Sequence, residues 1–373
     1  MNKIYLDHAA TTYVKPEVIE EMTQVLVQFG NPSSTHSFGR SAKSLIESSR
    51  KQIAALLGAK AKEILFNSCA TEGNNWIIQQ AVKSLGVTRI ISSEMEHHAV
   101  LYPVKAWQKE GIAVEFVKVL ADGQLDLVHL ESLLQNNQPT LVSLMHINNE
   151  TGIINDLVGI GNLCKQYGAY YHADMVQSVG KYPINLAELP VDFMVASAHK
   201  FHGPKGAGLV YVKSPLVLQP TILGGEQEKG YRAGTEAPHQ IVGMAKALEL
   251  SYVHLEAERT HIQALKQYTL EQLQQHLPGT EPNGNPEMTT YNILNVRLPL
   301  SAEKASMLLF ALDMKNIAIS RGSACQSGSG KPSHVLACFL NDEQGAMPNI
   351  RISFAENNTK EEIDYLVAAL TEA

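Results

Sequence analysis

Polar and ionisable side chains recur directly after five short apolar segments of this 373-residue sequence. Ligands of open parallel sheets bind outside the carboxyl ends of the strands. If the five segments are strands of one such sheet, the residues that follow them share an edge and predict a binding site there. They are 67–72 (NSCATE), 96–98 (EHH), 148–150 (NNE), Asp174 with Gln177, and His199 with Lys200.

Lys200 is the residue of this set best suited to covalent chemistry. It closes the segment SAHK at 197–200, directly behind an apolar strand. Lysines are rarely buried, and burial disfavours their charged form, which leaves a nucleophilic amine able to form a Schiff base. The alternative is a lysine whose stem lies along the rim of the sheet with its amine in water.

Two further features complete the pattern expected for one cofactor. Asp174 also ends a strand, where a buried carboxylate requires a cation such as a protonated pyridine nitrogen, or else forms an ordinary salt bridge or helix cap. The turn 68–71 (SCAT) precedes a predicted helix whose first N–H groups suit a phosphate, unless Ser68 or Thr71 merely caps that helix. A Schiff-base lysine, a carboxylate and an anion site together predict pyridoxal 5'-phosphate (PLP).

Cys325 and Arg351 are candidates for handling a substrate. Small residues flank Cys325 in 320–332 (SRGSACQSGSGKP), so we expect an accessible nucleophile that can move, or else a free surface cysteine. Arg351 lies inside a predicted strand, where it requires a carboxylate partner. A substrate carboxylate and a structural ion pair are both open. Cys164 and Cys338 lie in apolar helical settings and are expected to be structural.

Other site chemistries fit the sequence less well. His97 and His98 are adjacent, so they point in different directions on a helix, and no third residue has metal-ligand spacing. Neither GxxxxGK[ST] nor GxGxxG occurs, which argues against nucleoside triphosphate and dinucleotide sites.

Short strands that alternate with amphipathic helices must position these residues. We predict strands at 63–66, 88–92, 114–119, 140–146, 169–173, 192–197 and 208–213, with helices at 16–29, 40–57, 71–85, 97–110, 126–135 and 156–167. Strands that are apolar on both faces indicate an α/β fold with a mostly parallel, doubly covered sheet. A helical stretch at 238–276 leads into a smaller α+β part with strands at 291–298, 316–320 and 349–353 and helices at 302–314 and 359–371.

Composition narrows the class of protein. Hydrophobic residues make up 45% and charged residues 18%, as in globular chains, and the net charge of -7 argues against a general nucleic-acid binder. Four cysteines without metal or disulfide spacing favour a reduced, cytoplasmic compartment. No stretch has the length and apolarity of a signal sequence or a membrane span, so we expect neither secretion nor insertion.

The ordered motifs resemble those of the NifS/IscS-type cysteine desulfurases, which are fold-type-I PLP enzymes. The similarity runs over nearly the whole chain. It includes YLDHAATT (5–12), GNPSSTHSFGR (30–40), ATEGNN (70–75), EHHAV (96–100), NNETG (148–152), HADMVQSVGK (172–181), SAHKFHGPKGAG (197–208), GGEQEKGYRAGTE (224–236), SRGSACQSG (320–328) and RISF (351–354).

The resemblance implies a role for each candidate residue. Lys200 would hold PLP as a Schiff base, His97 would stack on its ring and move protons, and Cys325 would take the sulfur of L-cysteine as a persulfide. Asp174 would pair with the ring nitrogen and Gln177 with the ring hydroxyl. The phosphate would be bound by Ala70, Thr71, Ser197 and His199, with Thr235 from the other subunit of a homodimer, and the substrate carboxylate by Asn149 and Arg351.

The family also implies a domain division and a partner. Residues 16–250 would form a large PLP-binding domain around a seven-stranded sheet, and 1–15 with 251–373 a small domain that carries the Cys325 loop. Sulfur would pass to an acceptor protein, either a tRNA-thiolating enzyme or an iron–sulfur scaffold. The tail after Arg351 is shorter than in IscS proteins, where it helps dock the scaffold, so we expect the tRNA-thiolating enzyme at least equally.

Related activities share part of this pattern. A selenocysteine lyase or an aminotransferase would also use Lys200 and Asp174, although an aminotransferase would not need Cys325. A catalytically silent sulfur-carrier subunit would keep only the fold, and intact Lys200, His97 and Cys325 argue against it. Two positions depart from the family, which usually has glycine in place of Cys69 and Glu226. A positive φ at position 69 would disfavour any side chain there.

Overall fold

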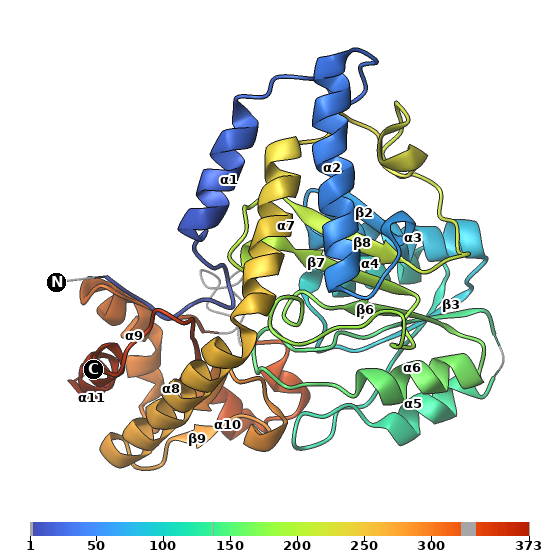
Figure 1. Ribbon diagram of the computed structural model, residues 1–373. Coiled ribbons are helices and arrows are strands. Elements are labelled where there is room, and N and C mark those ends of the chain that lie inside the picture. Colours follow the sequence, from blue (N-terminus) through green and yellow to red (C-terminus); the bar gives the residue numbers. More distant parts are fainter. Residues whose placement is uncertain (1–2, 137, 322–332, 373) are drawn as a thin grey trace.

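A seven-stranded sheet forms the centre of the larger part of the molecule (Figure 1). The computed structural model describes residues 3–136, 138–321 and 333–372. In spatial order the strands are β2 (Ile64–Asn67), β8 (Gly208–Val212), β7 (Phe193–Ser197), β6 (Tyr170–Asp174), β5 (Thr140–Ser143), β3 (Arg89–Ser92) and β4 (Ala113–Phe116). Strand β8 is antiparallel to both of its neighbours, and the other neighbouring pairs are parallel. The predicted α/β fold with a mostly parallel seven-stranded sheet is confirmed.

Helices cover both faces of this sheet because successive strand residues point to opposite sides. Ile64 and Phe66 of β2 pack in a core with α1 (Pro16–Leu26), α2 (Ser37–Leu56), α5 (Leu127–Leu134), α6 (Leu157–Gln166) and α7 (Pro238–Val253). Leu65, between them, packs on the other face against α3 (Ala70–Leu85) and α4 (His98–Lys109). The sheet is therefore buried on both sides, as its continuous apolar strands predict.

A separate core lies in the C-terminal third. The antiparallel strands β12 (Asn349–Ser353), β10 (Ile293–Arg297) and β9 (Glu281–Pro282) pack with α8 (Leu255–His276), α9 (Ala302–Met314) and α11 (Lys360–Glu372), while the short α10 spans Asp342–Ala346. Ile4 and Leu6 belong to this core, and β1 (Ile4–Tyr5) pairs in parallel with β11 (Ile317–Ala318). The first residues of the chain thus pack with the last hundred.

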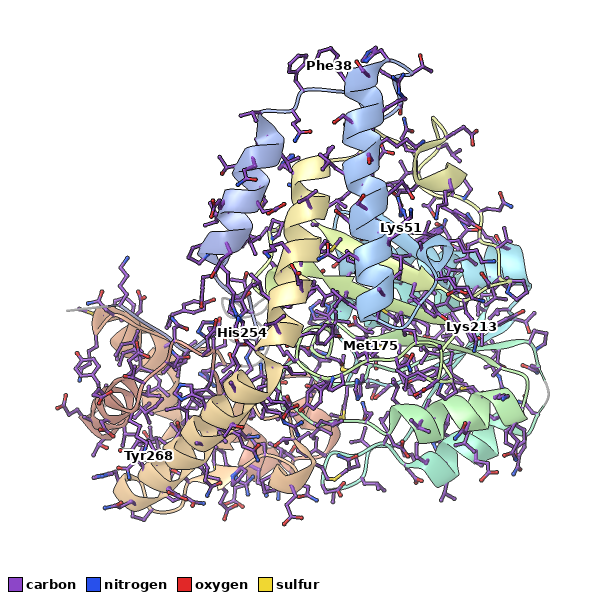
Figure 2. The ribbon with its side chains drawn as sticks, viewed as in Figure 1. Phe38, Lys51, Met175, Lys213, His254 and Tyr268 are labelled. Atoms are coloured by element: carbon purple, nitrogen blue, oxygen red, sulfur yellow. The ribbon has the colours of Figure 1, made fainter. Side chains whose placement is uncertain are left out.

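Element boundaries differ from the predictions where a local contact decides them. The predicted stretch 238–276 is two helices, α7 and α8, which meet at His254 (Figure 2). Met244 of α7 packs on the large sheet and Ile262 of α8 in the C-terminal core, so the apolar period continues through the bend. Helix α2 begins at Ser37 rather than 40, because His36 Nδ1 accepts from Gly39 N (3.3 Å) and caps it.

Within the described ranges, no helix combines the length and the apolarity that a bilayer span requires. The N-terminal segment 6–12 runs between the turn after β7 and strand β12 of the C-terminal core. Its backbone joins Leu6 O to Ser353 N (2.8 Å) and His199 O to Thr12 N (2.9 Å). This places the predicted site between the two cores.

A buried ion pair connects the loop 224–236 to the sheet. Arg50 of α2 donates to both carboxylate oxygens of Glu228 (2.7 and 2.8 Å), and Phe66 N donates to the same carboxylate (2.8 Å). Both side chains are 2% exposed, and Glu228 has a left-handed φ of 45°. Glu226, where the family has glycine, has a φ of -82° that any residue adopts.

We expect Arg50→Ala to destabilise the protein by about 3–5 kcal/mol, because it leaves the Glu228 carboxylate buried without its cation. Chemical denaturation would measure the loss. Lys51→Ala, at the exposed neighbouring position on α2 (labelled in Figure 2), is the matched control and should change stability by less than about 0.5 kcal/mol. Equal stability of the two variants would contradict a structural role for the pair.

Candidate active site

A cavity of about 250 Å³ lies at the carboxyl ends of the parallel strands. Its walls come from the turns after β2, β3, β5, β6 and β7, from the N-terminal segment and from β12. Ten of the twelve residues predicted from the sequence line it: Ala70, Thr71, His97, Asn149, Asp174, Gln177, Ser197, His199, Lys200 and Arg351.

Lys200 lies in the 3-10 turn Ala198–Lys200 that follows β7. Its Nζ donates to the carbonyl oxygens of Ala9 (2.6 Å) and Ala10 (2.8 Å). The amine is therefore held inside the cavity by backbone acceptors and does not extend along the rim of the sheet. Two neutral acceptors leave it available as a nucleophile once it loses a proton.

Asp174 is the last residue of β6, and its carboxylate is only slightly exposed. Asn74 Nδ2 donates to Oδ2 (2.8 Å) and Val176 N donates to Oδ1 (3.1 Å). Neither partner is a cation, so the ordinary salt bridge considered from the sequence is not formed within the described residues. The carboxylate can take a cationic group in the cavity.

His97 caps α4, because its Nδ1 accepts from Ala99 N (3.1 Å). Burial lowers the pKa of the imidazole; the Asp174 carboxylate opposes that effect, while Lys200 and His334 add to it. The ring is thus neutral near pH 7, and because Nδ1 is an acceptor, its proton is on Nε2. A neutral, fixed ring of this kind suits stacking and proton transfer.

The start of α3 lines the cavity with Cys69, Ala70 and Thr71. Cys69 precedes the helix and its side chain makes no cap hydrogen bond, while Ala70 N donates to Ser197 Oγ (2.8 Å). Hence neither Ser68 nor Thr71 is the N-cap residue. Cys69 has an extended φ of -175°. The positive φ that would disfavour a side chain at this position is therefore absent. The uncapped helix start and the hydroxyls of Thr71 and Ser197 face the same cavity.

Arg351 of β12 is both a cavity residue and half of an ion pair. Its Nη2 donates to Asp7 Oδ1 (2.7 Å) and its Nη1 to the backbone oxygen of Asn149 (2.7 Å). Its Nε has no partner among the described residues. The sequence left a substrate contact and a structural pair open; the structure shows the pair with Asp7, in a guanidinium that still faces the cavity.

One predicted residue, Thr235, lies elsewhere. Thr235 is exposed and lines a different cavity, of about 210 Å³, with Ser68 and Gly208 among its neighbours. Cys325 lies outside the described residues.

Sequence reasoning missed three residues that hold the predicted ones in place. Asp7 pairs with Arg351, Asn74 donates to Asp174, and Lys181 donates to Gln177 Oε1 (3.0 Å). Lys181 stands four residues after Gln177, a spacing visible in the sequence. Asp7 and Arg351 are 344 positions apart, and no local pattern connects them.

These residues fit PLP. The cavity offers the start of α3 and two hydroxyls for a phosphate, and Asp174 offers a ring nitrogen a carboxylate that has no cationic partner among the described residues. Lys200 offers an amine for an aldehyde. Three different groups of one cofactor thus find complementary chemistry in a single cavity.

Comparisons with known proteins agree with this chemistry. Residues 4–366 match the family model "Aminotransferase class-V". The cysteine desulfurase IscS of Dictyoglomus turgidum is 38% identical over 371 residues, 99% of this chain and 93% of its own. A cysteine desulfurase of Trichormus azollae is 39% identical over 374 residues, 100% of this chain and 93% of its own.

A solved structure titled NifS-like protein has a TM-score of 0.92 at 34% identity, and the match covers 100% of this chain and 99% of that one. The relatives, which match over the full length of the chain, and the cavity, which suits PLP, thus indicate the same chemistry. The chain therefore belongs to the class-V aminotransferase family, within which it is a PLP-dependent cysteine desulfurase of the NifS/IscS type.

Proposed function

We propose that the enzyme moves the sulfur of L-cysteine onto Cys325 as a persulfide, releases L-alanine, and passes the sulfur to an acceptor protein. The observation that carries the proposal is that Lys200, Asp174 and Arg351 face one cavity from three separate elements. An amine, an anion and a guanidinium in that arrangement suit a cofactor linkage, a ring nitrogen and an amino-acid carboxylate.

PLP, when bound, supplies an electron sink that weakens the bonds at the substrate α-carbon. Lys200 carries the cofactor and then moves protons at that carbon, while Asp174 keeps the ring nitrogen protonated. His97, neutral with its proton on Nε2, lies in the same cavity as a second proton donor or acceptor. Ala70, Thr71, Ser197 and His199 bind the phosphate, and Gln177 binds the ring hydroxyl.

Arg351 and Asn149 orient the substrate. The guanidinium is already fixed by Asp7 and by the Asn149 carbonyl, so a substrate carboxylate meets a preorganised group. The Cys325 thiolate then forms an S–S bond with the substrate sulfur as the C–S bond breaks. A proton added at the former thiol-bearing carbon completes alanine.

The described residues on both sides of 322–332 support a role for Cys325. Ser320 exchanges two backbone hydrogen bonds with Arg351 (2.7 and 3.2 Å), at the edge of the cavity. On the other side, Ser333 Oγ donates to Glu150 Oε2 (2.5 Å), next to the cavity residue Asn149. Both attachment points thus lie beside the substrate-binding residues.

We also propose a cytoplasmic homodimer in which Thr235 completes the phosphate site of the partner. The tip patch, which comprises Leu26, Val27, Phe29 and Phe38 where α1 and α2 join, is exposed, and the rings of Phe29 and Phe38 stack at 5.2 Å (Figure 2). Contiguous exposed apolar residues mark interaction surfaces. The free thiols of Cys69, Cys164 and Cys338 suit a reducing compartment.

The division into a large domain (16–250) and a small domain (1–15 with 251–373) belongs to the same proposal, and the two separate cores support it. As acceptor we propose a tRNA-thiolating enzyme or an iron–sulfur scaffold. Incubating the persulfide-loaded enzyme with a candidate acceptor, and following the loss of sulfur from Cys325, would distinguish the two.

We expect Asp174→Asn to keep the fold and to lower alanine formation by about 100-fold or more, because an amide cannot stabilise a protonated ring nitrogen. Asp192→Asn is the matched control: Asp192 is also a partly buried carboxylate bonded to a backbone N–H (Tyr171, 2.9 Å), but it precedes β7 and lies outside the cavity. Near-normal turnover of Asp174→Asn would show that its carboxylate only caps the turn after β6.

We expect Cys325→Ser to retain PLP and to release neither alanine nor sulfide at the wild-type rate. Mass spectrometry of the wild-type enzyme after incubation with cysteine should show about 32 Da, one sulfur, added to the Cys325 peptide. Burial raises the pKa of Cys338 to about 11 and that of Cys164 still higher, so neither is a thiolate near pH 7. Cys69 lines the cavity, so Cys69→Gly is the control and should still form the persulfide on Cys325. Sulfur added to the Cys69 peptide of the wild-type enzyme would show that Cys69 is the nucleophile.

We expect the wild-type enzyme to sediment as a dimer at micromolar concentration and Phe29→Asp to dissociate it, because a charge opposes burial of the tip patch. Val128→Asp, at an 80% exposed apolar residue on α5, should leave the dimer intact. A monomeric wild-type enzyme with full activity would refute the shared phosphate site.

A further inference from the structure

Lys181 is a buried lysine directly behind the cavity. It follows Gly180 in the turn after β6, is 8% exposed, and donates from Nζ to Gln177 Oε1 (3.0 Å). Lysines are seldom buried to this degree without an anionic partner. Here the hydrogen-bond partner that the structure shows is a neutral amide, which suggests a task other than charge pairing.

The contact fixes which end of the Gln177 amide faces which way. A lysine can only donate hydrogen bonds, so it must meet the amide oxygen. The amide nitrogen then points to Ala9 O and donates to it (3.0 Å). The inverted amide would place two donors together at Lys181 and two acceptors together at Ala9.

The same contacts join Lys181 to Lys200. Ala9 O, which accepts from Gln177, also accepts from Lys200 Nζ (2.6 Å). Lys181 and Lys200 further line one small cavity, the rear cavity, which has a volume of about 30 Å³. The two amines are thus linked through one amide and one carbonyl, and share a cavity wall.

The other ionisable groups around the rear cavity are His8, His202, Glu258, Tyr291 and Glu356, and burial raises the pKa of Tyr291, so its ring is neutral. Both carboxylates already pair with Lys15 (2.7 and 3.1 Å), and His202 Nε2 contacts Glu356 Oε2 (3.4 Å). Burial lowers the pKa of His8 and of His202 to about 4, so both rings are neutral near pH 7. Lys200 is therefore the cation of this group that acts most directly on Lys181.

Burial, and after it the charge of Lys200, lower the pKa of Lys181 to about 7. Repulsion between two ammonium groups is mutual, so a charged Lys181 equally disfavours the charged form of Lys200. Below about pH 7 Lys181 is protonated and exerts this repulsion; above it the repulsion fades as Lys181 loses its proton.

We propose that Lys181 is a positioning residue with two effects: it keeps the amide nitrogen of Gln177 toward the cofactor oxygen, and it favours the uncharged nitrogen at Lys200. The inference rests on the proposed roles of Gln177 and Lys200. Lys181 acts through Gln177 and through its charge rather than by contact with substrate or cofactor.

The test compares Lys181→Met with the wild-type holoenzyme. We expect the PLP dissociation constant to rise about fivefold, the effect of one weakened hydrogen bond. Below about pH 7, where Lys181 is charged in the wild type, the visible absorbance of PLP bound at Lys200 should show a larger protonated fraction in the variant, because a neighbouring positive charge is gone. Above that pH the variant and the wild type should agree. Lys181→Gln also removes the charge but keeps a polar side chain, and it should raise the protonated fraction likewise.

Lys266→Met is the matched control. Lys266 is a partly buried lysine with its pKa lowered to about 8, but it donates to Thr289 Oγ1 and Thr290 O and lines neither cavity. It should leave both quantities unchanged. Wild-type values in both Lys181 variants would overturn the inference.

Gln177→Ala separates this failure from a failure of the proposed function. If Gln177→Ala weakens PLP binding while the Lys181 variants do not, only the inference about Lys181 is wrong. If Gln177→Ala also binds PLP as the wild type does, the proposed cofactor role of Gln177 is wrong too.

Discussion

The carbonyl oxygen of Ala9 accepts hydrogen bonds from Lys200 Nζ (2.6 Å) and from Gln177 Nε2 (3.0 Å). This acceptor belongs to the N-terminal segment, whereas both donors follow strands of the large sheet. The backbone N–H of the same residue donates to Ser353 Oγ in the C-terminal core (2.9 Å). One residue thus fixes the distance between the reactive amine and the strand that carries Arg351.

The rest of the N-terminal segment repeats this connection. Asp7 pairs with Arg351, and Thr12 N donates to His199 O (2.9 Å), so each side of the cavity is attached to the same segment, 6–12. Two cations, Lys200 and Arg351, are held by these residues, one by carbonyls and one by a carboxylate. Because a buried cation without partners is strongly unfavourable, the segment and the site stabilise each other.

Local sequence patterns were sufficient for most of the fold and for the composition of the cavity. Apolar strands such as 192–197 predicted a doubly covered sheet, and the polar residue after each strand predicted where the site lies. Patterns failed where a distant contact decides the outcome. The bend at His254 interrupts no helical period, and the pairing of Asp7 with Arg351 spans 344 positions. Periodicity carries no information about either.

Cys69 shows how a departure from the family pattern is accommodated. The backbone at this position is extended, with φ -175° and ψ 166°, so a thiol can replace the usual glycine hydrogen without strain. The close approach occurs instead on the neighbouring strand: a Cβ at Gly208 would lie 2.8 Å from Cys69 Cα and 2.5 Å from Asn67 Oδ1. The turn before α3 therefore depends on glycine at 208 rather than at 69, and the helix start remains open to an anion.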